Sequence, residues 1–256
     1  MPHFRSSDGT QIFYTGSGSD QVGPPVLLHH GFGASGEIDW RETTMVAALT
    51  AAGRRVITLD ARGHGHSDKP HDPARYGESR MADDVGNLLD VLAVPQVDLA
   101  GYSMGAVVSL ITAAREPRVR RLVVGGIGAG AVELGGVDTR ALAPGRLAEA
   151  MLIEDPSRLT DPIAVAFRAF AEATGADRLA LAAVATGMQH DRLPLSAVTV
   201  PTLVLAGRDD PLARRPETLA NALPDASVRL VDGDHGQVLR SPDFIDALVS
   251  FLAVGR

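Results

Sequence analysis

The stretch 97–111 reads Val-Asp-Leu-Ala-Gly-Tyr-Ser-Met-Gly-Ala-Val-Val-Ser-Leu-Ile. Its first four residues predict a buried strand and its last six predict a buried helix, so a short turn joins a strand to a helix. The turn has the pattern G-x-S-x-G and must be sharp, because a side chain at Gly101 or Gly105 would collide with neighbouring backbone. Such a turn lifts the hydroxyl of Ser103 clear of the sheet, which makes this serine a candidate nucleophile.

Short aliphatic and β-branched runs alternate with amphipathic segments around this turn. The alternation is typical of an α/β protein, in which helices cover a mostly parallel central sheet. Amphipathic helices are expected within 81–92 and 241–252, the second with a proline in its first turn. The expected strands are 11–14, 26–29, 56–59, 97–100, 122–124, 202–206 and 228–231.

The strand pattern stops between about 131 and 199, where two or three Ala-rich helical segments occur around Leu147, Phe167 and Leu181. We therefore predict a single domain, 1–256, that carries a small helical cap insertion at 131–199. A cap over the sheet would supply walls for a substrate pocket, although most apolar residues in it would also suit a stripe that faces the core. The candidate pocket residues are Met151, Ile153, Phe167, Phe170 and Met188.

The chain resembles the α/β-hydrolase superfamily over nearly its whole length. The resemblance rests on five motifs in family order: 30–33 (HGFG), 60–67 (DARGHGHS), 101–105 (GYSMG), 207–210 (GRDD) and 234–236 (DHG). It implies a mostly parallel sheet with helices on both faces. The sequence looks most similar to the compact esterase, lactonase, carbon–carbon hydrolase and haloperoxidase-like branch, since dehalogenases and epoxide hydrolases have an aspartate where this chain has Ser103.

A serine hydroxyl needs a base to take its proton, and that base needs a third group to orient it. The resemblance implies that His235 is the base, because it lies after a late strand and before the last helix. It also implies that the acid is Asp210, third after the turn-forming Gly207, where Pro211 biases the backbone before it toward an extended conformation. The neighbouring Asp209 stays open as the alternative acid.

In this family, backbone NH groups stabilise the oxyanion of the tetrahedral intermediate. The resemblance implies the NH groups of Phe32 and Met104 for that role. Other polar or flexible residues of the first two motifs are expected to hold their loops rather than to react. They are His30, Gly31, Gly33, Asp60, Arg62 and His64.

Two other classes of function remain open. Residues 31–36 are a literal G-x-G-x-x-G after a strand, and Asp60 ends the next strand, as in a nucleotide-dependent oxidoreductase. The helical pattern, however, begins only near Trp40, too late for a helix N-terminus to hold a pyrophosphate. A ligand receptor or regulator could also keep the hydrolase fold, because fold alone does not determine function.

Composition narrows the partners. The net charge of −7 comes with no basic stripe, so a nucleic-acid partner is not expected. The chain has no cysteine and a single lysine, Lys69, in a loop, which disfavours thiolate and Schiff-base chemistry. No apolar run approaches the roughly 20 residues that span a bilayer. We expect a cytoplasmic enzyme without metal or cofactor, and the oligomeric state stays open.

The charges of the predicted cap are mixed in sign, which favours a small, neutral, apolar substrate. We therefore expect cleavage of a carboxylic ester or lactone through an acyl-enzyme intermediate. Cleavage of a carbon–carbon bond and perhydrolysis remain alternatives, because the same residues could serve them.

Overall fold

A mostly parallel sheet of eight strands forms the centre of the computed structural model, which describes residues 2–21, 23–141, 145–188 and 191–253. The strand order is β1-β2-β4-β3-β5-β6-β7-β8; β1 and β2 run antiparallel to their neighbours, and the others are parallel. The strands are β1 (His3–Arg5), β2 (Gln11–Ser17), β3 (Val26–His29), β4 (Val56–Leu59), β5 (Val97–Tyr102), β6 (Val119–Gly125), β7 (Thr202–Gly207) and β8 (Ala226–Val231).

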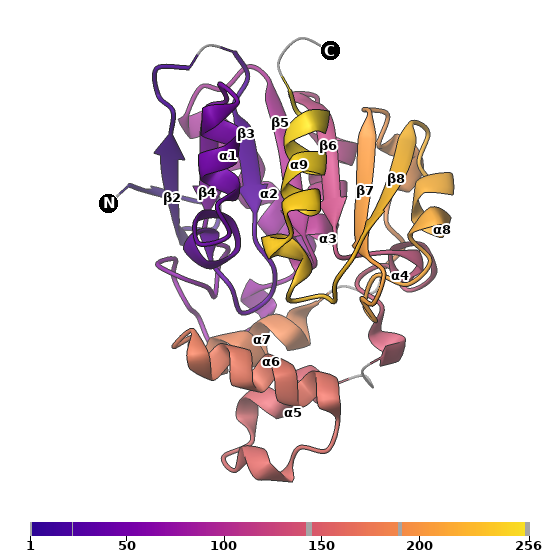
Figure 1. Ribbon diagram of the computed structural model, residues 1–256. Coiled ribbons are helices and arrows are strands. Elements are labelled where there is room, and N and C mark those ends of the chain that lie inside the picture. Colours follow the sequence, from indigo (N-terminus) through magenta and orange to yellow (C-terminus); the bar gives the residue numbers. More distant parts are fainter. Residues whose placement is uncertain (1, 22, 142–144, 189–190, 254–256) are drawn as a thin grey trace.

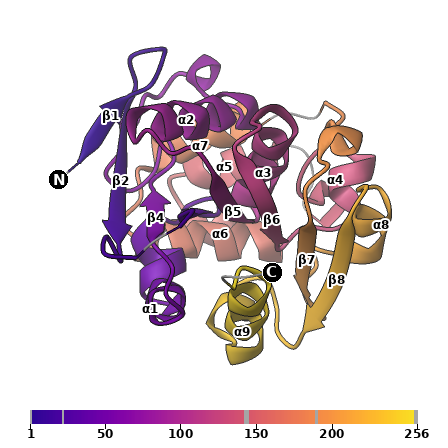
Figure 2. The ribbon, with the colours of Figure 1, turned by 90° about the horizontal axis from the view of Figure 1, so that it is seen from above.

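Helices cover both faces of this sheet (Figures 1 and 2). Helices α1 (Met45–Ala51) and α9 (Pro242–Phe251) pack on one face, and α2 (Glu78–Val91), α3 (Met104–Arg115) and α8 (Pro216–Asn221) pack on the other. Strand β5 lies inside the sheet with every residue buried, and β3 and β4 are buried throughout as well. This burial explains why these strands read as continuous apolar runs rather than as alternating patterns.

The remaining helices follow β6 in the chain. Helices α5 (Arg146–Leu152), α6 (Pro162–Ala173) and α7 (Arg178–Gly187) lie across the edge where the parallel strands end, below the sheet in Figure 1, and α5 packs against both of the others. Helix α4 (Ala129–Glu133) instead packs against α8. No strand occurs between β6 and β7 in the part of the chain that the structure describes. Residues 142–144 and 189–190 of the predicted cap lie outside that part, and the boundaries 131–199 stay a prediction.

The predicted fold class is confirmed, and the expected strands 26–29 and 56–59 coincide with β3 and β4. The other expected strands are longer in the structure by a few residues, as at β6, where Val119 already pairs with Val97. Strand β1 was not expected, because three residues are too few to show alternation. None of the helices among the described residues is long and apolar enough to cross a membrane.

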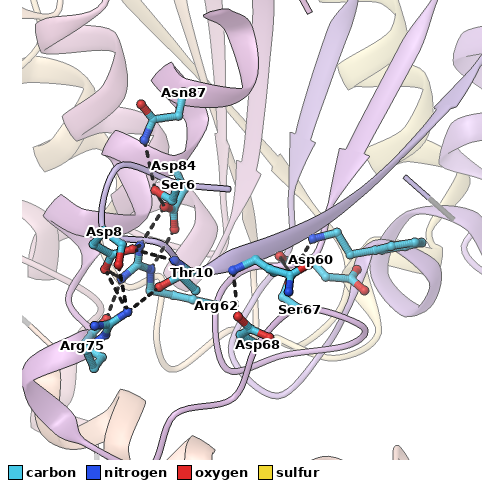
Figure 3. A network of polar contacts seen from close by, with 12 residues as sticks. Ser6, Asp8, Thr10, Asp60, Arg62, Ser67, Asp68, Arg75, Asp84 and Asn87 are labelled. Carbon is cyan, nitrogen blue, oxygen red and sulfur yellow. Dashed lines mark hydrogen bonds and ion pairs between the residues drawn. The ribbon is translucent and has the colours of Figure 1, made fainter. Parts of the chain in front are cut away.

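A largely buried ion-pair network joins the β1–β2 turn, the loop after β4 and α2 (Figure 3). The Arg62 guanidinium donates two hydrogen bonds to Asp84 of α2, of 2.7 and 2.8 Å, and one of 2.8 Å to Asp8 in the β1–β2 turn. The side chains of Arg62 and Asp84 are only 2% and 1% exposed, so each charge depends on the other for its partner. The loop after β4 is therefore held to α2 by a buried ion pair and to the β1–β2 turn by the partly exposed Asp8.

Candidate active site

The turn after β5 holds Ser103 in an unusual backbone conformation. Its φ is 53° and its ψ is −116°, in a region that residues other than glycine rarely adopt. A Cβ added at Gly101 would lie 2.1 Å from the carbonyl oxygen of Gly105, and one added at Gly105 would lie 2.2 Å from that of His29. The two glycines therefore allow the close backbone contacts that present the serine above the sheet.

Three side chains from three loops meet at this turn. His235 Nε2 lies 3.0 Å from Ser103 Oγ, and His235 Nδ1 lies 2.8 Å from Asp210 Oδ2. Ser103 follows β5, Asp210 follows β7 and His235 follows β8, and the carboxyl ends of parallel strands share one edge of the sheet. Distances of this size are those of a nucleophile, a base and an orienting acid.

The structure separates the two adjacent aspartates. The Asp210 side chain is completely buried, and its second oxygen accepts the backbone NH of Leu212 at 2.8 Å. Asp209 is exposed and has no side-chain hydrogen bond to His235. Of the two carboxylates, Asp210 is the one placed to orient the histidine.

Tyr102 supports His235 from the same turn, a role that sequence reasoning missed. Its hydroxyl donates to the His235 carbonyl oxygen at 2.5 Å, and the two rings lie 5.1 Å apart. Burial raises the pKa of Tyr102 well above its ordinary value, so the hydroxyl stays protonated as a donor. The variable position of a G-x-S-x-G pattern carries no signal for such a contact.

The loop after β3 runs beside Ser103. A Cβ added at Gly31 would lie 3.4 Å from Ser103 Cβ, and Phe32 follows at once in the cavity wall. None of the hydrogen bonds within the described residues uses the Phe32 NH, and Met104 is the first residue of α3, where an NH has no acceptor in its own helix. Both NH groups thus have no hydrogen-bond acceptor among the described residues, and Phe32 lines the same cavity as Ser103.

His30 holds this loop in place. Its Nε2 accepts the NH of Ala61 at 2.9 Å, so Nδ1 carries the proton and donates to the Gly31 carbonyl oxygen at 2.7 Å. Burial lowers the pKa of His30 to about 3, which keeps the ring neutral. The expected loop-shaping role of His30 therefore has a physical basis.

A cavity of about 450 Å³ opens above Ser103 and His235. Its walls are mostly apolar and include Phe167 and Phe170 of α6, two of the predicted pocket residues; the Phe167 ring packs edge-on against Phe32 at 5.8 Å. Met151 and Met188, also predicted, do not line it. Met151 is fully buried in the main core, and Met188 packs against that core at the end of α7, because the apolar faces of these helices pack inward.

A family model described as alpha/beta hydrolase fold matches residues 24–191 of the chain. The chain belongs to the α/β-hydrolase family. A hydrolase of Pseudomonas aeruginosa has a similar solved structure, with a TM-score of 0.78 and 27% sequence identity over 99% of this chain and 98% of that one. The resemblance based on the five motifs is thus confirmed.

Curated relatives of this α/β hydrolase also carry hydrolase names. The putative carbamate hydrolase RutD of Variovorax paradoxus is 34% identical over 254 residues, which cover 90% of this chain and 92% of that protein. A 2-hydroxymuconate semialdehyde hydrolase of Pseudomonas sp. strain CF600 is 40% identical over 106 residues. Those residues cover 41% of this chain and only 37% of that relative, so this second similarity spans little more than a third of its length.

Asp60 binds backbone rather than an external group. Its Oδ1 accepts the NH of Gly36 at 2.9 Å, and its Oδ2 accepts the NH of His66 at 2.8 Å. The side chain is buried, with the residue 3% exposed. Both oxygens are therefore engaged, which removes the ribose-binding acid that the dinucleotide alternative requires.

Asp39 is a second carboxylate at the site, and sequence reasoning missed it. It lies in a single π-helical turn (Glu37–Arg41), lines the cavity, and accepts the Gly31 NH at 2.8 Å through Oδ2. Burial raises its pKa to about 6, opposed by the Gly31 hydrogen bond and by the nearby His235 and Arg240. π-helical turns are frequent at functional sites, but their short length leaves no periodic pattern to detect. No cluster of metal-ligating side chains occurs among the described residues.

The Gly105→Ala variant tests the backbone constraint at the turn. We expect it to be destabilised by roughly 1–3 kcal/mol or more, because its Cβ would meet the His29 carbonyl oxygen at 2.2 Å. Gly86→Ala in α2 is the matched control. A Cβ there meets nothing nearer than 3.8 Å, so alanine should raise stability by roughly 0.5–1 kcal/mol. Urea denaturation measures both, and equal stability of the two variants would contradict the constraint.

Proposed function

We propose that this α/β hydrolase cleaves a carboxylic ester or lactone of a small, apolar substrate through an acyl-enzyme on Ser103. The observation that carries the proposal is the pair of contacts made by His235, 3.0 Å to Ser103 Oγ and 2.8 Å to Asp210 Oδ2. With Nδ1–H donating to Asp210, Nε2 has its lone pair directed at the serine hydroxyl. The imidazole can then accept the proton as Oγ attacks the carbonyl carbon.

The proposed reaction consists of two acyl transfers, first from the substrate to Ser103 and then from Ser103 to water. Ser103 Oγ bonds to the carbonyl carbon, its proton moves to His235, and the NH groups of Phe32 and Met104 stabilise the oxyanion. When the carbon–oxygen bond to the alcohol breaks, His235 returns the proton to the departing oxygen. Water then attacks the acyl-enzyme with His235 again as base, which releases the acid and frees Ser103.

The cavity supports a small apolar substrate. Its volume of about 450 Å³ lies within the range of small-molecule sites, and rings and aliphatic side chains form most of the wall. Because Phe167 and Phe170 come from α6, we propose that the α5–α7 segment acts as a cap that sets the preference for acyl length.

A carbamate is a second candidate substrate class. The relative that aligns over 92% of its own length bears the name putative carbamate hydrolase, and a carbamate carbonyl would be attacked by the same three side chains. An aryl ester and the corresponding aryl carbamate, compared on one preparation, distinguish the two classes.

Ser103→Ala should lower kcat for a short aryl ester by about 10⁴ to 10⁶, because the hydroxyl acts as one unit with its base. Ser109→Ala is the matched control: it removes a buried hydroxyl of the same helix that bonds the Gly105 carbonyl oxygen, and it should keep most of the activity. Steady-state rates with circular dichroism of each variant decide the point. Unchanged turnover in Ser103→Ala, or a wild type limited to one slow turnover as in a receptor, would contradict the proposal.

Asp210→Asn should lower kcat by roughly 10⁴, because the amide no longer holds the required tautomer of His235. Asp209→Asn makes the same change one residue away on an exposed side chain and should leave kcat within a few-fold of wild type. Both variants are assayed on one ester at one pH. A large loss in Asp209→Asn with a small one in Asp210→Asn would assign the acid to the other neighbour.

A further inference from the structure

We infer that Asp39 makes this site discriminate against anionic substrates and select neutral ones. The inference rests on the proposed hydrolysis at Ser103 and names a property of that same cavity. It depends on where one buried carboxylate lies and on which other charges face it.

Asp39 stands next to the reacting groups. A Cβ added at Gly31 would lie 3.4 Å from Ser103 Cβ and 3.5 Å from Asp39 Oδ2, so the carboxylate and the nucleophile flank the same glycine. Asp39 is 7% exposed and lines the cavity. Its Oδ2 accepts the Gly31 NH, but a neutral NH leaves the charge of the carboxylate in place. A substrate bound over Ser103 therefore lies beside a carboxylate that is largely shielded from water.

The other charged groups at the cavity do not neutralise the negative charge of Asp39. Arg240 also lines the wall, but its side chain is 57% exposed and its guanidinium lies 3.8 Å from the Glu42 carboxylate, where solvent screens it. Asp234 adds a second carboxylate, which accepts the NH groups of Gly236 and Gln237. Ionised, the two acids outnumber the one arginine, and the buried charge is negative.

Four other titratable side chains lie on the elements around Asp39 or on its own turn. Tyr102 of β5 stays protonated, and His235 is paired with Asp210 through Nδ1. On its own turn, Glu37 and Arg41 form a 3.6 Å ion pair at the surface. Among these described groups, Arg41 is bound to Glu37 at the surface, which leaves Arg240 as the arginine in the cavity wall.

A bound anion beside Asp39 would be repelled strongly, because like charges interact over short distances in a poorly solvated site. The repulsion requires an ionised Asp39. Burial raises the pKa of Asp39 to about 6, so the carboxyl is charged above pH 6 and neutral below it. Discrimination against anions should therefore be full at pH 8 and weaken as the pH falls through 6.

Two p-nitrophenyl esters of equal acyl length test this, one with a methyl end and one with a sulfonate end that stays anionic throughout. The measured quantity is the ratio of kcat/KM for the methyl ester to that for the sulfonate ester. The ratio should fall by roughly tenfold or more in Asp39→Asn, whose amide oxygen can still accept the Gly31 NH.

Glu37→Gln is the matched control, since it removes one negative charge from the same turn at a side chain that is 65% exposed, and its ratio should match wild type. The wild-type ratio, measured from pH 8 to pH 5, should fall as well, and this series needs no variant to fold. A ratio that neither Asp39→Asn nor pH changes, or a preference for the sulfonate ester, overturns the inference while hydrolysis at Ser103 stands. Absence of Ser103-dependent turnover on the methyl ester overturns the proposed function and, with it, the inference.

Discussion

The close approach of backbone around Ser103 is the constraint on which the site depends. A Cβ added at Gly105 would lie 2.2 Å from the carbonyl oxygen of His29, the last residue of β3. This contact packs the start of α3 against the chain that leads to Gly31 and Phe32, so Ser103 and this loop lie side by side. The parallel sheet then supplies the partners, because β7 and β8 end at the same edge and bring Asp210 and His235 to the serine.

Buried polar groups keep these loops from relaxing. His30 joins the β3 loop to Ala61, Asp60 joins Gly36 to His66, and Arg62 joins the β4 loop to α2 through Asp84. Each of these groups would be costly to bury without its partner. Asp60 and Arg62, which look reactive in the motif at 60–67, thus hold backbone NH groups and buried carboxylates, and the proposed chemistry falls to Ser103, His235 and Asp210.

Much of the fold could be predicted from the sequence, because buried parallel strands such as β3 and β4 show as continuous apolar runs with clear ends. The sharp turn that presents Ser103 was also predictable, since Gly101 and Gly105 have a steric reason to flank it. The choice of Asp210 over Asp209 depended on the position of the acid in the family, because the two neighbours are the same residue type.

Tyr102 and Asp39 were not predictable, because their roles arise from where three loops meet rather than from spacing along the chain. Met151 was predicted to line the pocket, but it is buried in the core. An apolar helix has a face toward the core and a face toward a cavity, and periodicity alone does not say which face is which.

The central claim is that Ser103 forms a covalent bond with the carbonyl carbon of the substrate. An alkylphosphonate p-nitrophenyl ester tests it directly. The serine displaces p-nitrophenolate, and the phosphonyl group that stays on the serine has the tetrahedral geometry of the intermediate and is hydrolysed slowly. Inactivated protein should carry one phosphonyl group per chain, and peptide mass spectrometry should place it on Ser103. An adduct on any other residue, or no adduct and no loss of activity, would contradict the claim.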